Sequence, residues 1–546
     1  MHRVTRRTPA AAERLHIIAL AERLHIIAAA KRLQIIAAAG LLSCSAAAWA
    51  DAPGRFEIDE FRVEGNTVLP TRDVEAAVYD FLGPNRGAGD VEKARATLED
   101  LYQKRGYPTV TVQIPRQEAG AIVRIVVTER KVGRLRVTNS RYFEPDAIRT
   151  GTPSLAPGTV PNINAVQHDM LALNRQPGLT VAPELRSGRE PDTMDVDLHV
   201  TDQLPLHGSL ELNNRQTADT TPLRLVGSLG YDNLWQRGDS IGLFFQVAPE
   251  RPSDALVYSA TYTFRIPGTG LSLVASYLKS DSDVAAVGGT DVVGKGQIAG
   301  LRLLVPLPDA SGLTENLAAG MDYKDFAQVL TLSGEGNKVP LTYYPVTIAY
   351  NATWTSDKSH TDLTVTDVMG TPGLGSSVAA FNANRAYASP NFIYLRAMAA
   401  HTHELPWGMQ LWARLQGQAT TDSLVPNEQF AAGGVDTVRG YLEAEVLGDN
   451  AADLQIELRS PSFAAAISPR INELRVHIFA DAAETSLNQP LPDQRRSYGL
   501  SSVGFGVRAR ILGHASASLE NAYTLSDAST TRHGADVLLF RLLGDF

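Results

Sequence analysis

From about residue 204 to the C terminus, apolar and polar residues alternate in repeated short runs. Successive side chains of a β-strand point to opposite faces, so this pattern predicts strands with one apolar and one polar face. The intervening positions are largely polar or small, as at Arg224, Ser228, Thr261 and Ser276. The apolar sets of the first four runs are Leu223, Leu225, Leu229 and Tyr231; Ile241, Leu243, Phe245 and Val247; Leu256, Tyr258, Ala260, Tyr262, Phe264 and Ile266; and Leu271, Leu273, Ala275 and Tyr277.

Two architectures fit such a pattern. A soluble sandwich buries the apolar face between two sheets. A transmembrane barrel turns that face towards lipid, lines a wet lumen with the polar set and leaves no open sheet edge. At roughly 9–11 residues per tilted strand plus turns, a stretch of about 340 residues suits an antiparallel transmembrane β-barrel of roughly 16 strands.

The C terminus favours the barrel. Leu538, Phe540, Leu542, Gly544 and Phe546 alternate up to the last residue, which resembles the terminal signature of bacterial outer-membrane proteins, with Phe546 as the C-terminal signal. This resemblance implies outer-membrane lipid as surroundings and the barrel-assembly machinery as the partner for insertion. Residues 267–270 and 405–408 would form short periplasmic turns, and residues 280–296 suit an external loop.

The block before the alternating runs has a different composition and mixes strand and helix signals. A strand at Phe56–Val63 turns at Gly65-Asn66, Thr71 is a candidate cap for a first helix, and a second helix stops at Arg105-Gly106. Strands at Thr109–Ile114 and Ala121–Thr128 complete an α+β unit of order β-α-α-β-β. A weaker second copy follows, and we place the domains at 55–130, 131–203 and 204–546.

The first 50 residues are typical of a signal peptide. Arg3, Arg6 and Arg7 precede an apolar run, and Ala48-Trp49-Ala50 offers a cleavage site. A transmembrane anchor and a lipoprotein acylated at Cys44 remain alternatives. Cys44 is the only cysteine, so the mature chain is expected to lack disulfides.

Charge argues against nucleic acid as a partner. The chain carries a net charge of −9, and residues 1–50 contribute seven Lys or Arg against two Glu, which leaves −14 for the rest.

Two short motifs in the α+β block resemble POTRA (polypeptide-transport-associated) domains. They are the Val-Glu-Gly-Asn-Thr turn at Val63–Thr67 and the Tyr-Gln-Lys-Arg-Gly-Tyr helix end at Tyr102–Tyr107. The unit order agrees with this family, although any small α+β module would share that order. The resemblance implies two periplasmic POTRA domains, fewer than in the assembly branches of the superfamily. With only a few residues between Ala50 and Arg55, a pore-plugging N-terminal helix is expected to be missing, unless cleavage occurs upstream of Ala50.

A cluster of motifs lies between two alternating runs: Glu428-Gln429-Phe430, Gly433-Gly434, Val438-Arg439-Gly440-Tyr441 and Gly448-Asp449-Asn450. It resembles the signature loop of the two-partner secretion transporters (the TpsB family, haemolysin secretion/activation type). Asn213-Asn214 and the run from Tyr231 to Ser240 resemble this family's first hairpin. The resemblance implies that the loop folds back into the barrel with Val438, Arg439, Gly440 and Tyr441 deep in the lumen.

Phe479-Ala480-Asp481-Ala482-Ala483 matches the family's Phe-x-Asp-x-Gly strand, except that Ala483 stands where the family has Gly. The resemblance implies that Asp481, on the same strand as Phe479, holds Arg439. A guanidinium is permanently charged and binds a carboxylate through two parallel hydrogen bonds, which suits a directional clamp. The alternative is that both residues are ordinary charges of the lumen.

The family implies that the chain exports an unfolded secreted exoprotein of the haemagglutinin or haemolysin type. An assembly factor that inserts other barrels is the main alternative, and a passive porin would leave the N-terminal modules unexplained. The common metalloprotease, esterase and nucleotide-binding motifs are missing from the sequence, so no enzyme activity, cofactor or metal is expected. His401 and His403 are expected at a strand end rather than on a metal.

Overall fold

The computed structural model describes residues 55–546 except 119, 283, 288–289, 294, 309–310 and 333–334. The predicted signal peptide, Cys44 and any N-terminal plug helix lie outside these residues. The described chain forms two compact units that meet in sequence between Pro205 and Leu206. Among the described residues, no helix is long and apolar enough to cross a membrane.

The first unit begins with an α+β module. Its elements are β1 (Phe56–Ile58), β2 (Glu60–Glu64), α2 (Thr71–Tyr79), β3 (Gly83–Arg86), α3 (Ala88–Lys104), β4 (Thr111–Gln113) and β5 (Ile122–Thr128). Strand β5 lies between β2, which is parallel to it, and β4, which is antiparallel. The apolar faces of α2 and α3 pack on this sheet around Val74, Leu98 and Ile125.

Two local predictions for this module are wrong. Strand β3, which pairs with β1, was not expected, because Gly-Pro-Asn-Arg carries no apolar alternation. Thr71 does not cap α2 but is its first residue, and Pro70 precedes it without a side-chain cap. Proline fits there because its fixed φ suits the helix start and its missing N–H would have no helical partner.

The two POTRA-like motifs meet at one buried carboxylate. Glu129 accepts the backbone N–H groups of Thr67 and Val68 at 2.9 and 3.1 Å and a longer bond from the Tyr102 hydroxyl at 3.3 Å. That hydroxyl also donates to Asn66 Oδ1 at 2.6 Å. The turn motif and the helix-end motif are therefore joined through their polar side chains.

A second module repeats the topology. It contains β6 (Lys131–Thr138), α4 (Pro145–Thr150), the 3₁₀ turn η1 (Pro153–Leu155), α5 (Ile163–Asn174), β7 (Leu179–Ser187) and β8 (Thr193–Asp202). The last strand, β8, again lies in the centre, parallel to β6 and antiparallel to β7. Asn162 caps α5 by accepting from the backbone of Asn164 and Ala165.

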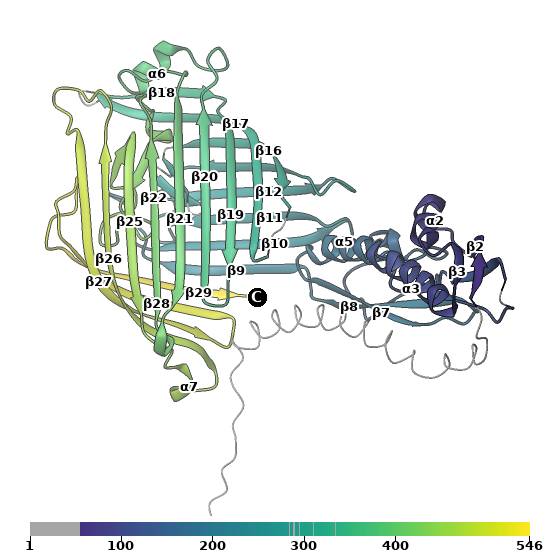
Figure 1. Cartoon of the computed structure of the whole chain (residues 1–546). Coiled ribbons are helices and arrows are strands. Elements are labelled where there is room, and N and C mark those ends of the chain that lie inside the picture. The colour runs from purple at the N-terminus through teal and green to yellow at the C-terminus, as the bar shows by residue number, and fades with distance from the viewer. Residues whose placement is uncertain are drawn as a thin grey trace, which may run out of the picture. The chain divides into compact units, whose positions relative to one another are not determined.

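The second unit is a closed antiparallel barrel of 16 strands, as predicted (Figure 1). Strands β18 and β19 pair in succession with the long strand β17 and together fill one place in the wall, so the 17 labelled strands form 16 places. The barrel strands are β9 (Leu206–Asn213), β10 (Arg224–Leu234), β11 (Asp239–Val247), β12 (Leu256–Arg265), β13 (Ser272–Ser280), β16 (Gly296–Pro306), β17 (Leu313–Leu332), β18 (Glu335–Tyr343), β19 (Val346–Thr355), β20 (Ser359–Met369), β21 (Ile393–Glu404), β22 (Gln410–Ala419), β25 (Asn450–Arg459), β26 (Ile471–Ser486), β27 (Ser497–Ile511), β28 (Ala515–Thr524) and β29 (Asp536–Asp545).

The alternation of the sequence separates the two faces of the barrel wall. Leu229, Leu243, Phe245, Tyr258 and Tyr277 are exposed on the outside, in agreement with the predicted apolar set. On β26 the residues at odd positions from His477 to Thr485 are buried, while Val476 and Ile478 are exposed. The inner face carries the polar side chains that surround the site.

The edges of the barrel differ. At the edge where the chain enters β9, the connections are short, and the turns predicted at 267–270 and 405–408 both lie there; the latter contains η2 (Pro406–Gly408). Short helix α7 (Ala464–Ile467) occupies another of these turns. The opposite edge carries the longer connections, with the hairpin β14 (Val284–Val287) and β15 (Thr290–Val293) and helix α6 (Val378–Asn384).

Strand β29 closes the barrel against β9, and we call this pairing the seam. Phe546 and Gly208 extend it by exchanging backbone hydrogen bonds of 3.0 and 3.1 Å. A Cβ on Gly208 would lie 2.9 Å from the Phe546 ring, so a side chain at this position would have to displace the ring. The role of Phe546 as an insertion signal stays a prediction.

Candidate functional site

The connection between β22 and β25 turns back into the barrel. We call residues 420–449 the lumen loop. It contains η3 (Pro426–Glu428) and a hairpin of β23 (Phe430–Ala432) and β24 (Val446–Gly448), whose tip spans residues 433–445. In this tip Val438, Arg439 and Tyr441 are all buried.

Gly440 is required at the tip by its backbone. Its φ is +93°, a conformation that residues with a Cβ rarely adopt. A Cβ built there would lie 3.1 Å from Thr524 Cγ2 and 3.2 Å from Ala522 Cβ. Gly440 therefore permits both the sharp turn and the close approach of the tip to β28.

Arg439 binds Asp481 on β26 through two side-chain bonds. Nε donates to Oδ2 at 2.7 Å and Nη2 donates to Oδ1 at 2.8 Å, while the Arg439 backbone N–H adds a bond of 3.1 Å. Its guanidinium carbon lies 3.6 Å from the centre of the Phe479 ring. Planar two-point pairing and stacking fix the direction of the Arg439 side chain, and the carboxylate of Asp481 compensates its charge.

Two further carboxylates complete the surroundings of Arg439. Its Nη1 lies 2.6 Å from Glu457 of β25 and 3.4 Å from Glu520 of β28. Arg508 of β27 bridges the same two carboxylates at 3.3 and 3.2 Å. We call these residues, with Asp481, the Arg439 cluster.

The charges around this cluster nearly cancel. Arg459 binds Glu457 at 2.7 Å. Three guanidiniums therefore face three carboxylates: those of Arg439, Arg459 and Arg508 against those of Glu457, Asp481 and Glu520. His477 lies 3.1 Å from Glu520. Because nearly all of these groups are buried, removing one charge leaves its partner uncompensated in a poorly solvated place.

Two glycines on β27 provide the space that the cluster fills. A Cβ on Gly504 would lie 2.3 Å from the Phe479 ring, and one on Gly506 would lie 2.7 Å from both His477 and Glu520. Ala483, the departure from the family pattern, is buried against Val438 and Tyr441. The extra methyl group is therefore accommodated in the apolar packing of the tip.

Tyr441 anchors the tip on its far side. Its hydroxyl lies within hydrogen-bond distance of the carbonyl groups of Ser501 and Ser526 at 3.0 and 2.8 Å, and of Ser526 Oγ at 2.9 Å. The four residues from Val438 to Tyr441 are thus held on both faces, by charge at Arg439 and by the hydroxyl at Tyr441.

Two buried acids fix the base of the lumen loop, and sequence reasoning did not give them a role. Glu428 binds Lys324 at 2.5 Å and accepts from the hydroxyls of Tyr343 and Tyr394 at 2.6 and 2.7 Å. Asp449 binds both terminal nitrogens of Arg385 at 2.6 and 2.7 Å. Both acids lie in the quoted motifs, but their partners are 104 and 64 residues away.

The possible metal ligands of the described residues are Glu457, His477 and Glu520, whose ligand atoms lie within 4.8 Å of one another. Both carboxylates already bind guanidiniums, so the group is compensated by Arg439 and Arg508. His401 and His403 lie on β21 away from it, and their rings stack at 5.9 Å.

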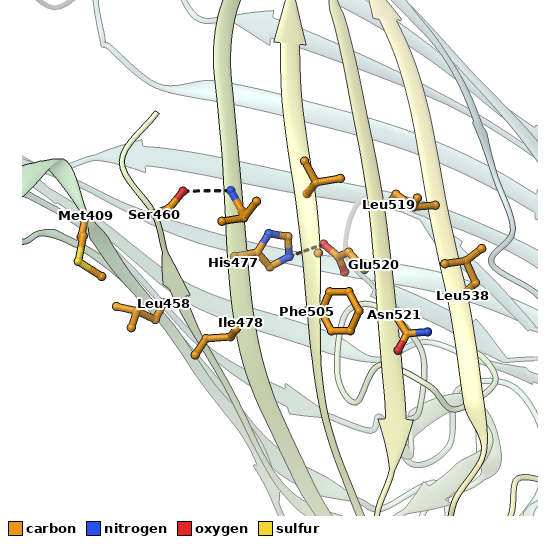
Figure 2. Close-up of a pocket in the computed structure, with 13 residues that line it drawn as sticks. Met409, Leu458, Ser460, His477, Ile478, Phe505, Leu519, Glu520, Asn521 and Leu538 are labelled. Carbon is orange, nitrogen blue, oxygen red and sulfur yellow. Dashed lines mark hydrogen bonds and ion pairs between the residues drawn. The ribbon is translucent and has the colours of Figure 1, made fainter. Parts of the chain in front are cut away.

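A depression of about 690 Å³ lies near the same strands. Figure 2 draws the side chains that line it. Most of its lining residues, including Ile478, Phe505 and Leu538, belong to the exposed outer face, while His477 and Glu520 also border it. The depression therefore opens on the apolar exterior of the wall, whereas the Arg439 cluster faces the lumen.

A sequence model of the ShlB-type POTRA domain matches residues 56–129. A model of the haemolysin secretion/activation proteins ShlB/FhaC/HecB matches residues 345–509, which include the lumen loop and β26.

Outer membrane transporter CdiB of Dickeya dadantii (strain 3937) is 25% identical over 185 residues, which are 34% of this chain and 32% of that protein. The matched segment thus spans about a third of this relative. CdiB from Escherichia coli has a similar solved structure, with a TM-score of 0.61, 19% identity and 93% of each chain covered. BamA from Haemophilus ducreyi, lacking POTRA domains 1–3, gives a TM-score of 0.54 at 13% identity over 90% of this chain and 100% of that one.

Fold and family models together define the class of protein: an outer-membrane β-barrel preceded by a periplasmic POTRA domain. Within that class, the chain is similar to the two-partner secretion transporters, because residues 56–129 match the ShlB-type POTRA domain and residues 345–509 match the haemolysin secretion/activation proteins ShlB/FhaC/HecB.

Proposed function

We propose that this protein recognises an unfolded secreted partner protein in the periplasm and moves it through the barrel lumen to the cell surface. The observation that carries the proposal is the lumen loop inside a closed barrel, with Arg439 held by Asp481, in a segment that matches the family model.

The partner would bind first at the POTRA modules. Strand β7 is an edge of its sheet, and an extended segment can pair with such an edge through backbone hydrogen bonds. This mode requires little sequence specificity from the backbone, and the side chains around the edge would supply the selection. The bound segment would then enter the lumen in an extended conformation.

Net movement would need no nucleotide. When the partner folds outside the cell, the unfolded chain is withdrawn from equilibrium with the pore, and transport is biased outwards by mass action. Because the lumen loop lies in the path, it must move aside or serve as a brace beside the passing chain.

The test compares culture-supernatant proteins of the wild type and of a strain in which the gene is deleted. The proposal predicts the loss of one large secreted polypeptide with an otherwise unchanged outer membrane. The alternative, insertion of other barrels into the membrane, has support in the structural similarity to BamA. It predicts envelope-wide loss of barrels with no single missing secreted protein, and that result would reject export.

A further inference from the structure

The three residues that follow β9 connect two parts of the barrel that are remote in sequence. Arg215 lies 228 residues from Glu443 of the tip, and Asn214 lies 324 residues from Leu538 of β29. One short segment therefore touches both the lumen loop and the strand that closes the seam.

Arg215 binds the tip through two carboxylates. Nε donates to Glu443 Oε1 at 2.8 Å and Nη2 to Glu443 Oε2 at 3.2 Å, and Nη2 also pairs with Asp436. Glu443 is buried, and its backbone N–H donates to the carbonyl of Gln216 at 2.9 Å. This arrangement holds the side of the tip that Arg439 does not reach.

Asn214 extends the seam with its side chain. Its Nδ2 donates to the carbonyl of Leu538 at 2.8 Å, and its Oδ1 accepts from the N–H of Phe540 at 2.8 Å. The Asn214 amide thus takes the place of a β9 backbone unit opposite β29, just beyond Asn213, where the paired part of β9 ends.

From these contacts we infer that Arg215 is a second positioning residue for the lumen loop and couples the position of the tip to the order of the seam. Withdrawal of the tip removes both carboxylate partners of Arg215 and frees the segment that carries Asn214. The part of the seam next to Leu538 and Phe540 then loses its support. The importance of this coupling for transport rests on the proposed function, but the coupling itself does not need a client.

The experiment uses the full mature chain, purified and reconstituted in lipid. Hydrogen–deuterium exchange is followed in two peptides, one from the tip and one from β29, and single-channel conductance is recorded in planar bilayers. Arg215→Ala should raise the exchange rate in both peptides and increase the fraction of time in the open state. Pairwise couplings in proteins change equilibrium constants by roughly 2- to 150-fold, and we expect the changes in exchange rate and in open-state population to fall within that range.

Two variants separate coupling from general weakening. Arg541→Gln removes an ion pair across the seam, Arg541 to Glu211 at 2.8 Å. The interaction of Arg541 with the tip is a longer-range Coulombic one with Asp436, so this variant should affect the β29 peptide more than the tip peptide. Arg215→Ala combined with Glu443→Gln should open the pore no more often than Arg215→Ala alone.

If Arg215→Ala does not fold, Glu443→Gln tests the same contact from the loop side. The inference is overturned if folded Arg215→Ala or Glu443→Gln leaves the β29 peptide unchanged, or if the two substitutions add fully. Because no client is present, these outcomes are independent of the supernatant comparison that tests export.

Discussion

The charge balance of the Arg439 cluster makes a quantitative prediction. With Arg459 included, three guanidiniums face three carboxylates, so Arg439→Met leaves one excess negative charge and Asp481→Asn leaves one excess positive charge. The side chains of Arg439 and Asp481 are 3% and 0% exposed, so water cannot compensate either change. Breaking a buried pair from one side costs about 3–5 kcal/mol.

The double variant, Arg439→Met with Asp481→Asn, restores two guanidiniums against two carboxylates. We therefore expect it to be destabilised by less than the sum of the single variants, by about 1–3 kcal/mol of coupling. The measurement is urea unfolding of each purified barrel in lipid vesicles, with folded protein quantified by its faster migration in unheated gel samples.

A matched control is the Arg541–Glu211 pair, in which Arg541 is half exposed. Its neutralisation should change stability by less than about 1 kcal/mol, as for other solvated ion pairs. If the Arg439 and Asp481 variants were additive, or as mild as this control, the cluster would not act as a buried charge-compensated unit.

Three further predictions concern other parts of the chain. Tyr102→Phe removes a buried hydroxyl from Asn66 and Glu129 and should lower the free energy of unfolding of the first module by about 1–3 kcal/mol, measured by urea denaturation; a change near zero would contradict the role of Glu129 as a junction. Gly440→Ala should weaken the tip's attachment because of the positive φ and the contacts with β28, and should increase proteolysis of the lumen loop in the folded barrel, whereas an unchanged digestion rate would argue against the required turn. In the second module, the hydrogen bond from Arg136 lowers the pKa of Asp197. The stability contributed by this pair is therefore present above the ordinary carboxyl pKa and is lost as pH falls through the lowered value. Asp197→Asn should flatten the dependence of stability on pH in that acidic range, and an unchanged acid dependence would refute this role of the pair.

The alternation of the sequence was sufficient to predict the strands and their two faces, because the side chains of a strand repeat with a period of two. The choice of a barrel over a sandwich also needed the C-terminal signature that ends at Phe546. Leu229, Leu243 and Phe245 face outward because they occupy the alternate, apolar positions of their strands. Strand β3 escaped prediction because Gly83–Arg86 has neither alternation nor apolar residues, and only its pairing with β1 makes it a strand.

The candidate site required more than local patterns. The pairing of Arg439 with Asp481 was expected only from the family resemblance, since nothing in a separation of 42 residues specifies it. Lys324, Arg385 and Arg215 were not predicted as partners of the lumen loop, because their contacts depend on barrel register and on the path of a long loop. Asp449 and Glu428 stood in recognisable motifs, but their immediate neighbours are polar residues or glycine, so no local apolar pattern marked either acid as buried.

Export by defined variants tests the central claim most directly. The deletion strain is complemented with the wild-type chain, Arg439→Ala or Asp481→Ala, and the secreted polypeptide that deletion removes is quantified relative to folded barrel in the outer membrane. We predict that the wild type restores secretion and that both variants insert as folded barrels but do not secrete. Full secretion by both variants would contradict a lumen loop whose attachment through Arg439 is required for transport.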